Sequence, residues 1–437
     1  MHSSTGTSHD YVTSDVVIAG AGIGGLVTAL SLHECGIGVQ LFESVESIRA
    51  LGVGINLLPH AVRELDALGL LDELTAQSLA PDTMGYFTKR GETIWTEQRG
   101  RAAGYAWPQL SIHRGTLHTV LFDAVVRRLG PDRMHTSHHL VRFDAKEDHV
   151  DAVFQNRSTS SETTIRTPAL IGVDGIHSVA RQQLYPDQGM PKWNGARLWR
   201  GMTLTEPVLD GKTMVWCGHP DQKFIAYPVT PVEQGRHQLN FIAELRSDET
   251  ELSQREDWNQ PGVLTDFLPA FESWKFDWLD VPSLLRAAPQ TFLFPMVDRD
   301  PVERWSFGRV TLLGDAAHPM YPVGSNGASQ AILDARVIAG CLRAYGTDIH
   351  SAFERYDAIR RPITSNIVLA NRGFGPELPM KLVEERAPDG FDNINDVIAP
   401  AEIAEVTEGY RRTAGFTLAA LANPAAPSLI DADYTSP

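Results

Sequence analysis

Three glycines near the N-terminus have the spacing of a phosphate-binding turn. The segment GAGIGG places Gly20, Gly22 and Gly25 in a G-x-G-x-x-G pattern, with Ile23 and Gly24 between its last two glycines. The first glycine permits a tight bend, the second lets a pyrophosphate approach the backbone, and the third lets a helix lie close to a strand. The pattern therefore predicts a turn whose backbone N–H groups bind the pyrophosphate of a dinucleotide.

The flanking residues predict the elements that position this turn. An apolar run at 16–19 predicts a buried strand, residues 26–33 predict a helix ending at Gly36, and residues 39–42 predict a second strand. Glu43 closes that strand, where a carboxylate accepts hydrogen bonds from ribose hydroxyls and repels a 2′-phosphate. Because all the parts occur in order, the unit favours FAD or NAD over NADP, and over a glycine-rich turn without a ligand.

Two further predicted strands end in an acidic residue beside a glycine. Asp174 and Gly175 follow an apolar strand at 169–173, and Gly314 and Asp315 follow another at 309–313. Ligands of open parallel sheets bind at the carboxyl ends of the strands, so both turns are predicted to face the ligand. Asp315 is expected to hold a ribityl hydroxyl.

A helix reaching about residue 344 is predicted shortly after the second of these turns. Its first backbone N–H groups and the positive end of its dipole would stabilise a reduced, anionic ring system. The predicted contacts are Gly324, Ser325, Asn326 and Gly327.

Two arginines and a loop glycine complete the predicted cofactor contacts. Arg49 could pair with a phosphate, and Gly54 in the loop after it would let the backbone approach a flat ring. Arg114 enters an amphipathic helix predicted over 111–130 and could contact the cofactor from there. Ordinary loop contacts for Arg49 and Gly54, and a surface salt bridge for Arg114, stay open as alternatives.

The region 195–245 consists of short, aromatic-rich alternating runs, which predict an antiparallel sheet, and residues 83–97 predict a β-hairpin. Such a sheet beside a nucleotide-binding domain predicts a cleft, in which Arg200 or Tyr227 could orient a carboxylate or a ring heteroatom. The alternative is that its aromatic residues only form the core of the sheet. The predicted wall consists of Trp199, Arg200, Trp216, Tyr227 and Phe241, faced from the cofactor side by Pro322 and Val323.

Composition restricts the expected partners to small molecules. The 437 residues carry a formal net charge of −16 without a long basic cluster, which argues against nucleic acid and acidic membranes. The three cysteines show no CxxC spacing, so neither a disulfide framework nor a metal site is expected. Residues 1–14 predict a disordered tail without a secretion signal, nothing reaches membrane-spanning length, and a cytoplasmic protein is expected.

The motifs occur in the order of a known enzyme family. GAGIGG with Glu43, VDGIHSVAR and LLGDAAHPMYPVGSNGASQAILDA make residues 15–372 resemble the single-component, FAD-dependent aromatic hydroxylases of the para-hydroxybenzoate and salicylate hydroxylase type. LGVGINLLP, LWRG and FPMVDRDP resemble most closely the branch that acts on 5-methylphenazine-1-carboxylate. The sequence departs from the commoner G-Q-G-x-N pattern of the family at residues 323–327.

The resemblance implies an α/β fold, with a Rossmann-like FAD-binding domain and an inserted antiparallel-sheet substrate domain. It also implies that Arg49 and Arg114 lie along the pyrophosphate and ribityl chain, and that Asp174 and Gly175 serve both FAD and the nicotinamide cofactor. The implied boundaries are 15–80, 100–184 and 295–375 for the FAD-binding domain, 81–99 and 185–294 for the substrate domain, and 376–437 for a C-terminal helical segment and surface tail.

The implied reaction consumes NADH or NADPH and O₂. FAD is reduced, oxygen adds at the flavin C4a, and the hydroperoxide hydroxylates an electron-rich aromatic or N-heteroaromatic small molecule. An FAD-dependent oxidase or dehydrogenase, and a non-catalytic FAD- or NAD-binding protein, are the alternatives. The sequence leaves open the substrate, the choice between NADH and NADPH, a coupled decarboxylation, and whether the protein is a monomer or a homodimer.

Overall fold

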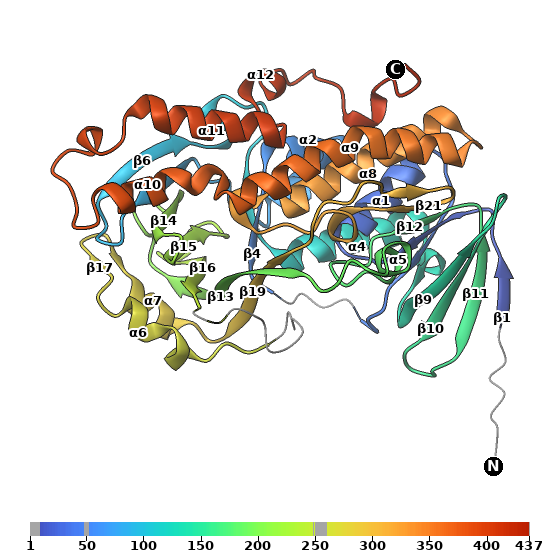
Figure 1. Cartoon of the computed structure of the whole chain (residues 1–437), viewed down its shortest axis with the longest axis horizontal. Coiled ribbons are helices and arrows are strands. Elements are labelled where there is room, and N and C mark those ends of the chain that lie inside the picture. Colours follow the sequence, from blue (N-terminus) through green and yellow to red (C-terminus); the bar gives the residue numbers. More distant parts are fainter. Residues whose placement is uncertain (1–8, 48–51, 248, 250–259, 437) are drawn as a thin grey trace, which may run out of the picture.

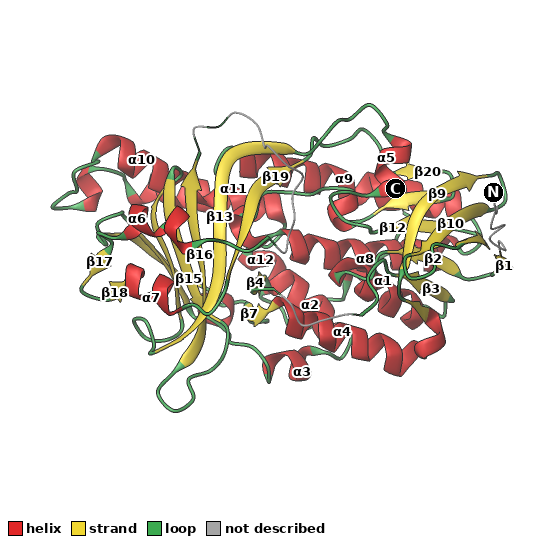
Figure 2. Ribbon diagram, turned by 90° about the horizontal axis from the view of Figure 1, so that it is seen from below, coloured by secondary structure: helices red, strands yellow, loops and turns green. Residues whose placement is uncertain are grey.

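A mostly parallel sheet and a larger antiparallel sheet dominate opposite halves of the molecule (Figures 1 and 2). The computed structural model describes residues 9–47, 52–247, 249 and 260–436. Within these residues, no helix is long and apolar enough to cross a bilayer. The arrangement is the predicted α/β fold, with an antiparallel sheet inserted into a nucleotide-binding unit.

The mostly parallel sheet carries the glycine-rich turn. Its six strands have the order β20-β21-β12-β2-β3-β8, and only β20 runs antiparallel to its neighbour. Strands β2 and β3 are buried along their whole length, as expected for apolar runs between two covering layers. The strands are β2 Val16–Ala19, β3 Val39–Phe42, β8 Met134–His135, β12 Leu170–Gly172, β20 Ser306–Phe307 and β21 Val310–Leu312.

Helices surround this sheet, and α8 packs against both α1 and α9. The first helix begins at Ile23, three residues before its predicted start, because Gly24 and Gly25 are already helical. The helices of this half are α1 Ile23–Glu34, α2 Pro59–Ala67, α3 Leu71–Thr75, α4 Arg114–Leu129, α5 Val179–Leu184, α8 Gly327–Tyr345 and α9 Ile349–Arg372.

A four-stranded sheet at the edge of this half differs from its prediction. Two polar, alternating runs between about 141 and 165 predict two strands, but the segment contributes to three. The fourth strand, β1 (His9–Val12), comes from the predicted disordered tail and pairs in parallel with β11. An edge strand offers unpaired backbone groups, which a polar segment can satisfy without an apolar pattern of its own. The other strands are β9 His138–Ala145, β10 Val150–Asn156 and β11 Glu162–Thr167.

The seven-stranded sheet has the order β19-β13-β16-β15-β14-β5-β6. Its antiparallel centre and the β5–β6 hairpin confirm the predictions for 195–245 and 83–97. The boundary predicted between 294 and 295 falls inside β19. The strands are β5 Thr83–Phe87, β6 Thr93–Gln98, β13 Lys192–Thr205, β14 Thr213–His219, β15 Gln222–Pro228, β16 His237–Arg246 and β19 Thr291–Asp298.

The two faces of this sheet belong to different apolar cores. One face packs against α6 and α7, and the other packs against α10 and α11. Two small antiparallel pairs, β4 with β7 and β17 with β18, complete the strands. These elements are β4 Gly54–Leu57, β7 Leu110–His113, β17 Lys275–Phe276, β18 Leu279–Asp280, α6 Leu268–Phe271, α7 Val281–Ala287, α10 Leu378–Arg386, α11 Pro400–Ala414 and α12 Leu418–Leu421.

The C-terminal residues do not form the predicted surface tail. Ile430 and Tyr434 are buried, and the Tyr434 ring occupies the space that a Cβ at Gly340 of α8 would need. Ser428 donates a hydrogen bond to the buried Glu64 carboxylate and accepts one from Arg336 at 3.0 Å. The prediction was wrong because these contacts join positions far apart in the chain, and such pairs leave no periodic signal.

Candidate active site

The three pattern glycines of the first turn meet three different requirements. A Cβ at Gly20, where φ is +112°, would lie 2.3 Å from the carbonyl oxygen of Val173. A Cβ at Gly25 would lie 1.9 Å from the Gly20 carbonyl oxygen, so the glycine permits close packing of α1 on β2. A Cβ at Gly22 would meet no atom within 4 Å. The protein itself leaves the space at Gly22 open, as a bound pyrophosphate requires.

Glu43 and His118 hold this turn from two sides. Glu43 lies at the end of β3 and accepts hydrogen bonds from the backbone N–H groups of Ala21, at 2.8 Å, and Val45, at 2.9 Å. The His118 ring on α4 lies 2.6 Å from the Ala21 carbonyl oxygen through Nε2. Burial is the main cause of the lowered pKa of His118. A neutral imidazole that donates to Ala21 fixes the turn without adding charge beside it.

Asp174 was predicted to face the ligand, but in the structure its carboxylate binds the first backbone N–H groups of helix α5. Its carboxylate accepts hydrogen bonds from the Ser178 hydroxyl and from the backbone N–H of Val179, at 2.7 Å. Burial raises the pKa of Asp174 despite these bonds. Gly175 beside it has φ +79° and open space at its Cβ position. A direct contact of these two residues with a cofactor stays a prediction.

Asp315, after β21, and Arg114, at the start of α4, carry opposite charges and lie close enough to attract each other. Both side chains are exposed, and neither makes a hydrogen bond to any residue that the structure describes. Protein nevertheless crowds around each: burial raises the pKa of Asp315 and lowers that of Arg114, while attraction between the two opposes both shifts. Arg49, the other predicted arginine, lies outside the described residues.

Together these groups fit the cofactor that the turn predicts. Gly22, Glu43 and Asp315 follow strands β2, β3 and β21 of one parallel sheet, and Arg114, which follows β7 of the small pair, lies close enough to Asp315 to attract it. An elongated dinucleotide needs backbone N–H groups for its pyrophosphate and polar side chains for its hydroxyl groups. The fold and these turns therefore define a flavin- or nicotinamide-binding α/β protein.

The loop before α8 has an unusual backbone, which a tyrosine from α11 supports. Gly324 and Ser325 both have positive φ, +69° and +57°, and a non-glycine residue reaches this region only at a cost in free energy. The Tyr410 hydroxyl accepts a hydrogen bond from Asn326 at 2.9 Å and lies 2.7 Å from Oδ1 of Asn371. Gly324 is required because a Cβ there would lie 2.3 Å from the Tyr410 hydroxyl.

The predicted aromatic wall is divided between the two faces of the seven-stranded sheet. Trp199 stacks on Phe267, and Phe241 stacks on Phe224, in the core on the α6–α7 side. The four aromatic residues therefore do not form one continuous wall, because alternation along a strand does not reveal which side chains share a face with those of the next strand. Trp216 and Tyr227 do belong to the opposite face.

Tyr227 and Arg200 are engaged by the backbone of β4. The Tyr227 hydroxyl and Nη2 of Arg200 donate to the Gly54 carbonyl oxygen at 2.6 and 2.9 Å. The Gly54 N–H donates to Oδ1 of Asn240 at 2.7 Å. Gly54 thus joins the two halves of the protein, and a role of Tyr227 or Arg200 in orienting a ligand stays a prediction.

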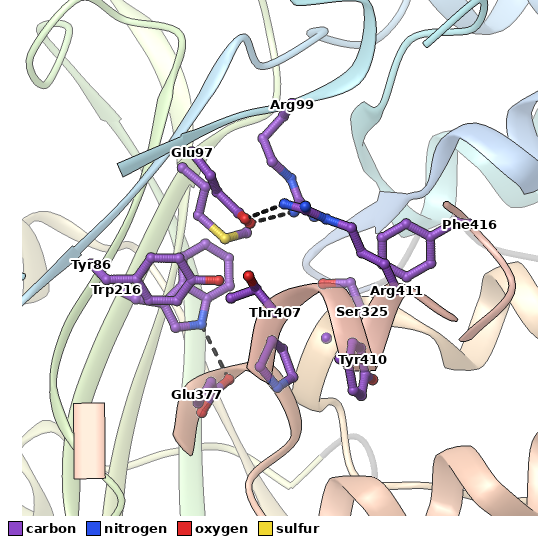
Figure 3. Close-up of a pocket in the computed structure, with 13 residues that line it drawn as sticks. Tyr86, Glu97, Arg99, Trp216, Ser325, Glu377, Thr407, Tyr410, Arg411 and Phe416 are labelled. Carbon is purple, nitrogen blue, oxygen red and sulfur yellow. Dashed lines mark hydrogen bonds and ion pairs between the residues drawn. The ribbon is translucent and has the colours of Figure 1, made fainter. Parts of the chain in front are cut away.

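A narrow cavity of about 20 Å³ lies on the Trp216 face of the sheet and reaches the loop before α8 (Figure 3). Tyr86 and Trp216 form one side, and Ser325 lies on another. Gly324, its neighbour in the chain, also lines the cavity. The predicted Pro322 and Val323 do not line it: Pro322 is exposed, and Val323 is buried in the adjoining core. The remaining lining residues are Met84, Glu97, Arg99, Pro376, Glu377, Thr407, Tyr410, Arg411 and Phe416.

Ion pairs surround this cavity on two sides. The Trp216 indole N–H donates to Glu377 at 3.3 Å, and Glu377 also pairs with the buried Lys223 at 2.6 Å. Glu97 pairs with Arg99 on another side, at 2.6 Å. Glu97, Arg99, Lys223 and Glu377 were not predicted, because they come from the end of β6, from β15 and from the segment before α10 and share no local motif.

The chain belongs to the FAD binding domain family, whose model matches residues 13–370. The part of the cavity wall contributed by α11 lies beyond this match. Family membership and fold agree with the predicted FAD-binding domain.

Curated relatives identify the reaction class. The chain is 45% identical over 403 residues to phenazine 1,6-dicarboxylic acid hydroxylase of Lysobacter antibioticus, covering 91% of this chain and 96% of that protein. It is 31% identical to 3-hydroxybenzoate 6-hydroxylase of Klebsiella oxytoca, over 82% and 87% of the two chains. In fold it matches a salicylate hydroxylase–substrate complex with a TM-score of 0.72 and 22% identity, over 95% and 99% of the chains. The protein is an FAD-dependent aromatic hydroxylase, which uses O₂ and a reduced nicotinamide.

Proposed function

We propose that this hydroxylase acts on a planar N-heteroaromatic acid of the phenazine type, bound at the cavity between β14 and α11, whose side chains must move apart to admit the ring. The observation that carries the proposal is the 45% identity, over nearly the full length of both chains, to a protein named as a phenazine 1,6-dicarboxylic acid hydroxylase. The hydroxybenzoate hydroxylase of Klebsiella oxytoca is only 31% identical. The aromatic side of the cavity, where Tyr86 and Trp216 lie with ring centroids 6.0 Å apart, supports a flat substrate.

When bound, FAD supplies the redox chemistry, by taking electrons from NADH or NADPH and activating O₂ for transfer to the ring. Among this chain's residues, the backbone of 20–25 would bind the pyrophosphate, and Glu43 would face the ribose. Arg114 and Asp315 would bind along the ribityl chain. Residues 324–327 would lie beside the ring system.

The cavity residues would orient the substrate and exclude water. Burial raises the pKa of Tyr86 well above its usual value, so its hydroxyl stays protonated. No described residue hydrogen-bonds to this hydroxyl, which leaves it able to donate to a ring nitrogen or a carboxylate of the substrate. The Trp216–Glu377 hydrogen bond would fix the indole against the ring. A cytoplasmic location and a monomeric or dimeric state stay predictions.

The test is a substrate panel with the purified FAD-loaded protein. Phenazine 1,6-dicarboxylate, phenazine-1-carboxylate, 3-hydroxybenzoate and salicylate would each be incubated with NADH or NADPH in the presence of O₂. We expect the phenazine acids to give faster nicotinamide oxidation than the benzoates, with a product 16 mass units heavier, or with hydroxyl in place of carboxylate. Preferential hydroxylation of the benzoates would contradict the phenazine assignment.

A further inference from the structure

Two arginines from distant parts of the chain meet at one side of the cavity. Arg99 follows β6, Arg411 lies on α11, and the carboxylate of Glu97 binds both guanidinium groups (Figure 3). Arg99 Nη1 lies 2.6 Å from Glu97 Oε1, and Arg411 Nη2 binds Oε2. The side chains of Arg99, Glu97 and Arg411 are only 11%, 13% and 24% exposed, so solvent screens this group weakly.

Several guanidinium donors of this group remain available. Arg99 Nε donates to Gln109 at 2.9 Å, and Arg411 Nη1 lies 3.3 Å from Glu408. Within the described chain, neither Arg99 Nη2 nor Arg411 Nε donates a hydrogen bond. Both residues line the cavity, so we expect these two donors to reach a ligand there.

The surrounding charges favour one anionic group at this side of the cavity. Glu97 neutralises only one of the two guanidinium charges, and Glu408 is 44% exposed, so water screens its effect. Glu377, the other cavity carboxylate, pairs with Lys223 at 2.6 Å, and Lys223 also pairs with the buried Glu244. The cavity is therefore cationic beside Arg99 and Arg411 and anionic beside Glu377.

We propose that Arg99 and Arg411 form a carboxylate-binding subsite that makes a ring carboxylate a requirement for tight substrate binding. Guanidinium groups match the planar geometry of a carboxylate, and Phe416 and Tyr86 supply apolar surface for the attached ring. The proposal rests on the cavity being the substrate site, as proposed above. Glu97 has two opposing effects. Its ion pairs hold both arginines in place, but its negative charge repels the carboxylate of the ligand.

The experiment compares ligands that differ only in their carboxylates. Phenazine-1-carboxylate and unsubstituted phenazine form one pair, and benzoate and benzene form another; binding to the FAD-loaded protein is measured from the change in the flavin absorption spectrum. We expect the wild-type protein to prefer the carboxylate of a pair by about tenfold to a hundredfold. Arg411→Gln, Arg99→Gln and the double variant should reduce that preference toward one while leaving binding of the uncharged ring unchanged.

Two variants separate carboxylate binding from a purely structural role. Glu97→Gln removes the repelling charge but keeps a side chain of the same size, so we expect the carboxylate preference to rise. Arg412→Gln removes the same charge from an exposed site on the same helix, so we expect the carboxylate preference to stay at the wild-type value. Equal loss of preference in Glu97→Gln and Arg411→Gln, or an unchanged preference in the double variant, would overturn the proposal.

The two ligand pairs also distinguish this proposal from the phenazine assignment. If the benzoate pair shows an arginine-dependent preference while neither phenazine binds, the subsite stands and the phenazine assignment fails. If both rings bind without regard to their carboxylates, the subsite fails while the phenazine assignment can still hold.

Discussion

Gly22 and Gly25 lie in one turn, yet replacing Gly22 should affect FAD binding and replacing Gly25 should affect folding. Gly22→Val should fold normally, since its Cβ meets nothing within 4 Å, but should lose FAD because the side chain occupies the pyrophosphate space. Gly25→Val should instead fail to fold, because its Cβ would overlap the Gly20 carbonyl oxygen. Flavin absorbance per protein and thermal unfolding of the apoproteins measure the two effects. A yellow Gly22→Val protein with full flavin content would exclude this turn as the pyrophosphate site.

Asp315 and Asp174 form a second pair with opposite expectations. Asp315→Ala should weaken FAD binding by roughly 1.5–3 kcal/mol, about tenfold to a hundredfold, because a charge-assisted hydrogen bond is lost. The fold should be little affected, since no described residue hydrogen-bonds to this carboxylate. Asp174→Ala should lower the free energy of unfolding of the apoprotein by about 0.5–2 kcal/mol, since the first two backbone N–H groups of α5 lose their acceptor. FAD titration and denaturant unfolding of both variants test this, and unchanged FAD affinity in Asp315→Ala would show that Asp315 is not a ligand.

Among the structural elements, helix α11 links the cavity to the loop before α8. Tyr410→Phe keeps the ring but removes the hydroxyl shared by Asn326, Asn371 and the Val323 carbonyl. Leaving these buried groups unpaired should lower the free energy of unfolding by about 1–3 kcal/mol. A looser loop beside the flavin should also raise the fraction of NAD(P)H oxidation that yields peroxide instead of hydroxylated product.

Tyr434→Phe is the matched control for this variant. Tyr434 is also buried, and its hydroxyl donates to the Leu429 carbonyl far from the cavity. It should lose stability without any change in the ratio of peroxide to product. An equal change of that ratio in both variants would show that the effect of Tyr410→Phe comes from lost stability and not from the contact with the loop before α8.

The elements differ in how well the sequence predicts them. The unit from Val16 to Glu43 was predicted almost completely, because its signals are local: apolar runs, glycine spacing and a strand-end acid. Of the residues that line the cavity, only Trp216, Gly324 and Ser325 were among the predicted site residues. Glu97 and Arg411 are 314 positions apart, and no periodicity within either segment reveals such a pairing. The sequence also did not reveal which side chains of β13 and β16 face α6 and α7, because period-two alternation fits either face of the sheet equally well.

For the whole molecule, Gly54 is the point where the FAD-binding half meets the substrate half. A Cβ at this position would lie 2.8 Å from Asn240 Cβ, 2.8 Å from Val229 Cγ1 and 2.9 Å from Tyr227 Cε2. All three neighbours belong to the seven-stranded sheet or the residue that follows it. Contact with three atoms at once leaves no single side chain that could relieve the overlap by rotating.

Gly54→Ala should therefore shift the seven-stranded sheet relative to the FAD-binding half. Overpacking of this kind costs about 1–3 kcal/mol of the free energy of unfolding. It should also misplace the substrate ring relative to the flavin, so that NAD(P)H and O₂ are consumed with less hydroxylated product. Gly409→Ala on α11, where a Cβ would meet only the Arg412 guanidinium at 3.9 Å, is the control and should retain full coupling. Oxygen uptake, peroxide and product are measured in the same reaction. A Gly54→Ala protein with normal stability and normal coupling would show that the two halves do not depend on this contact for their alignment.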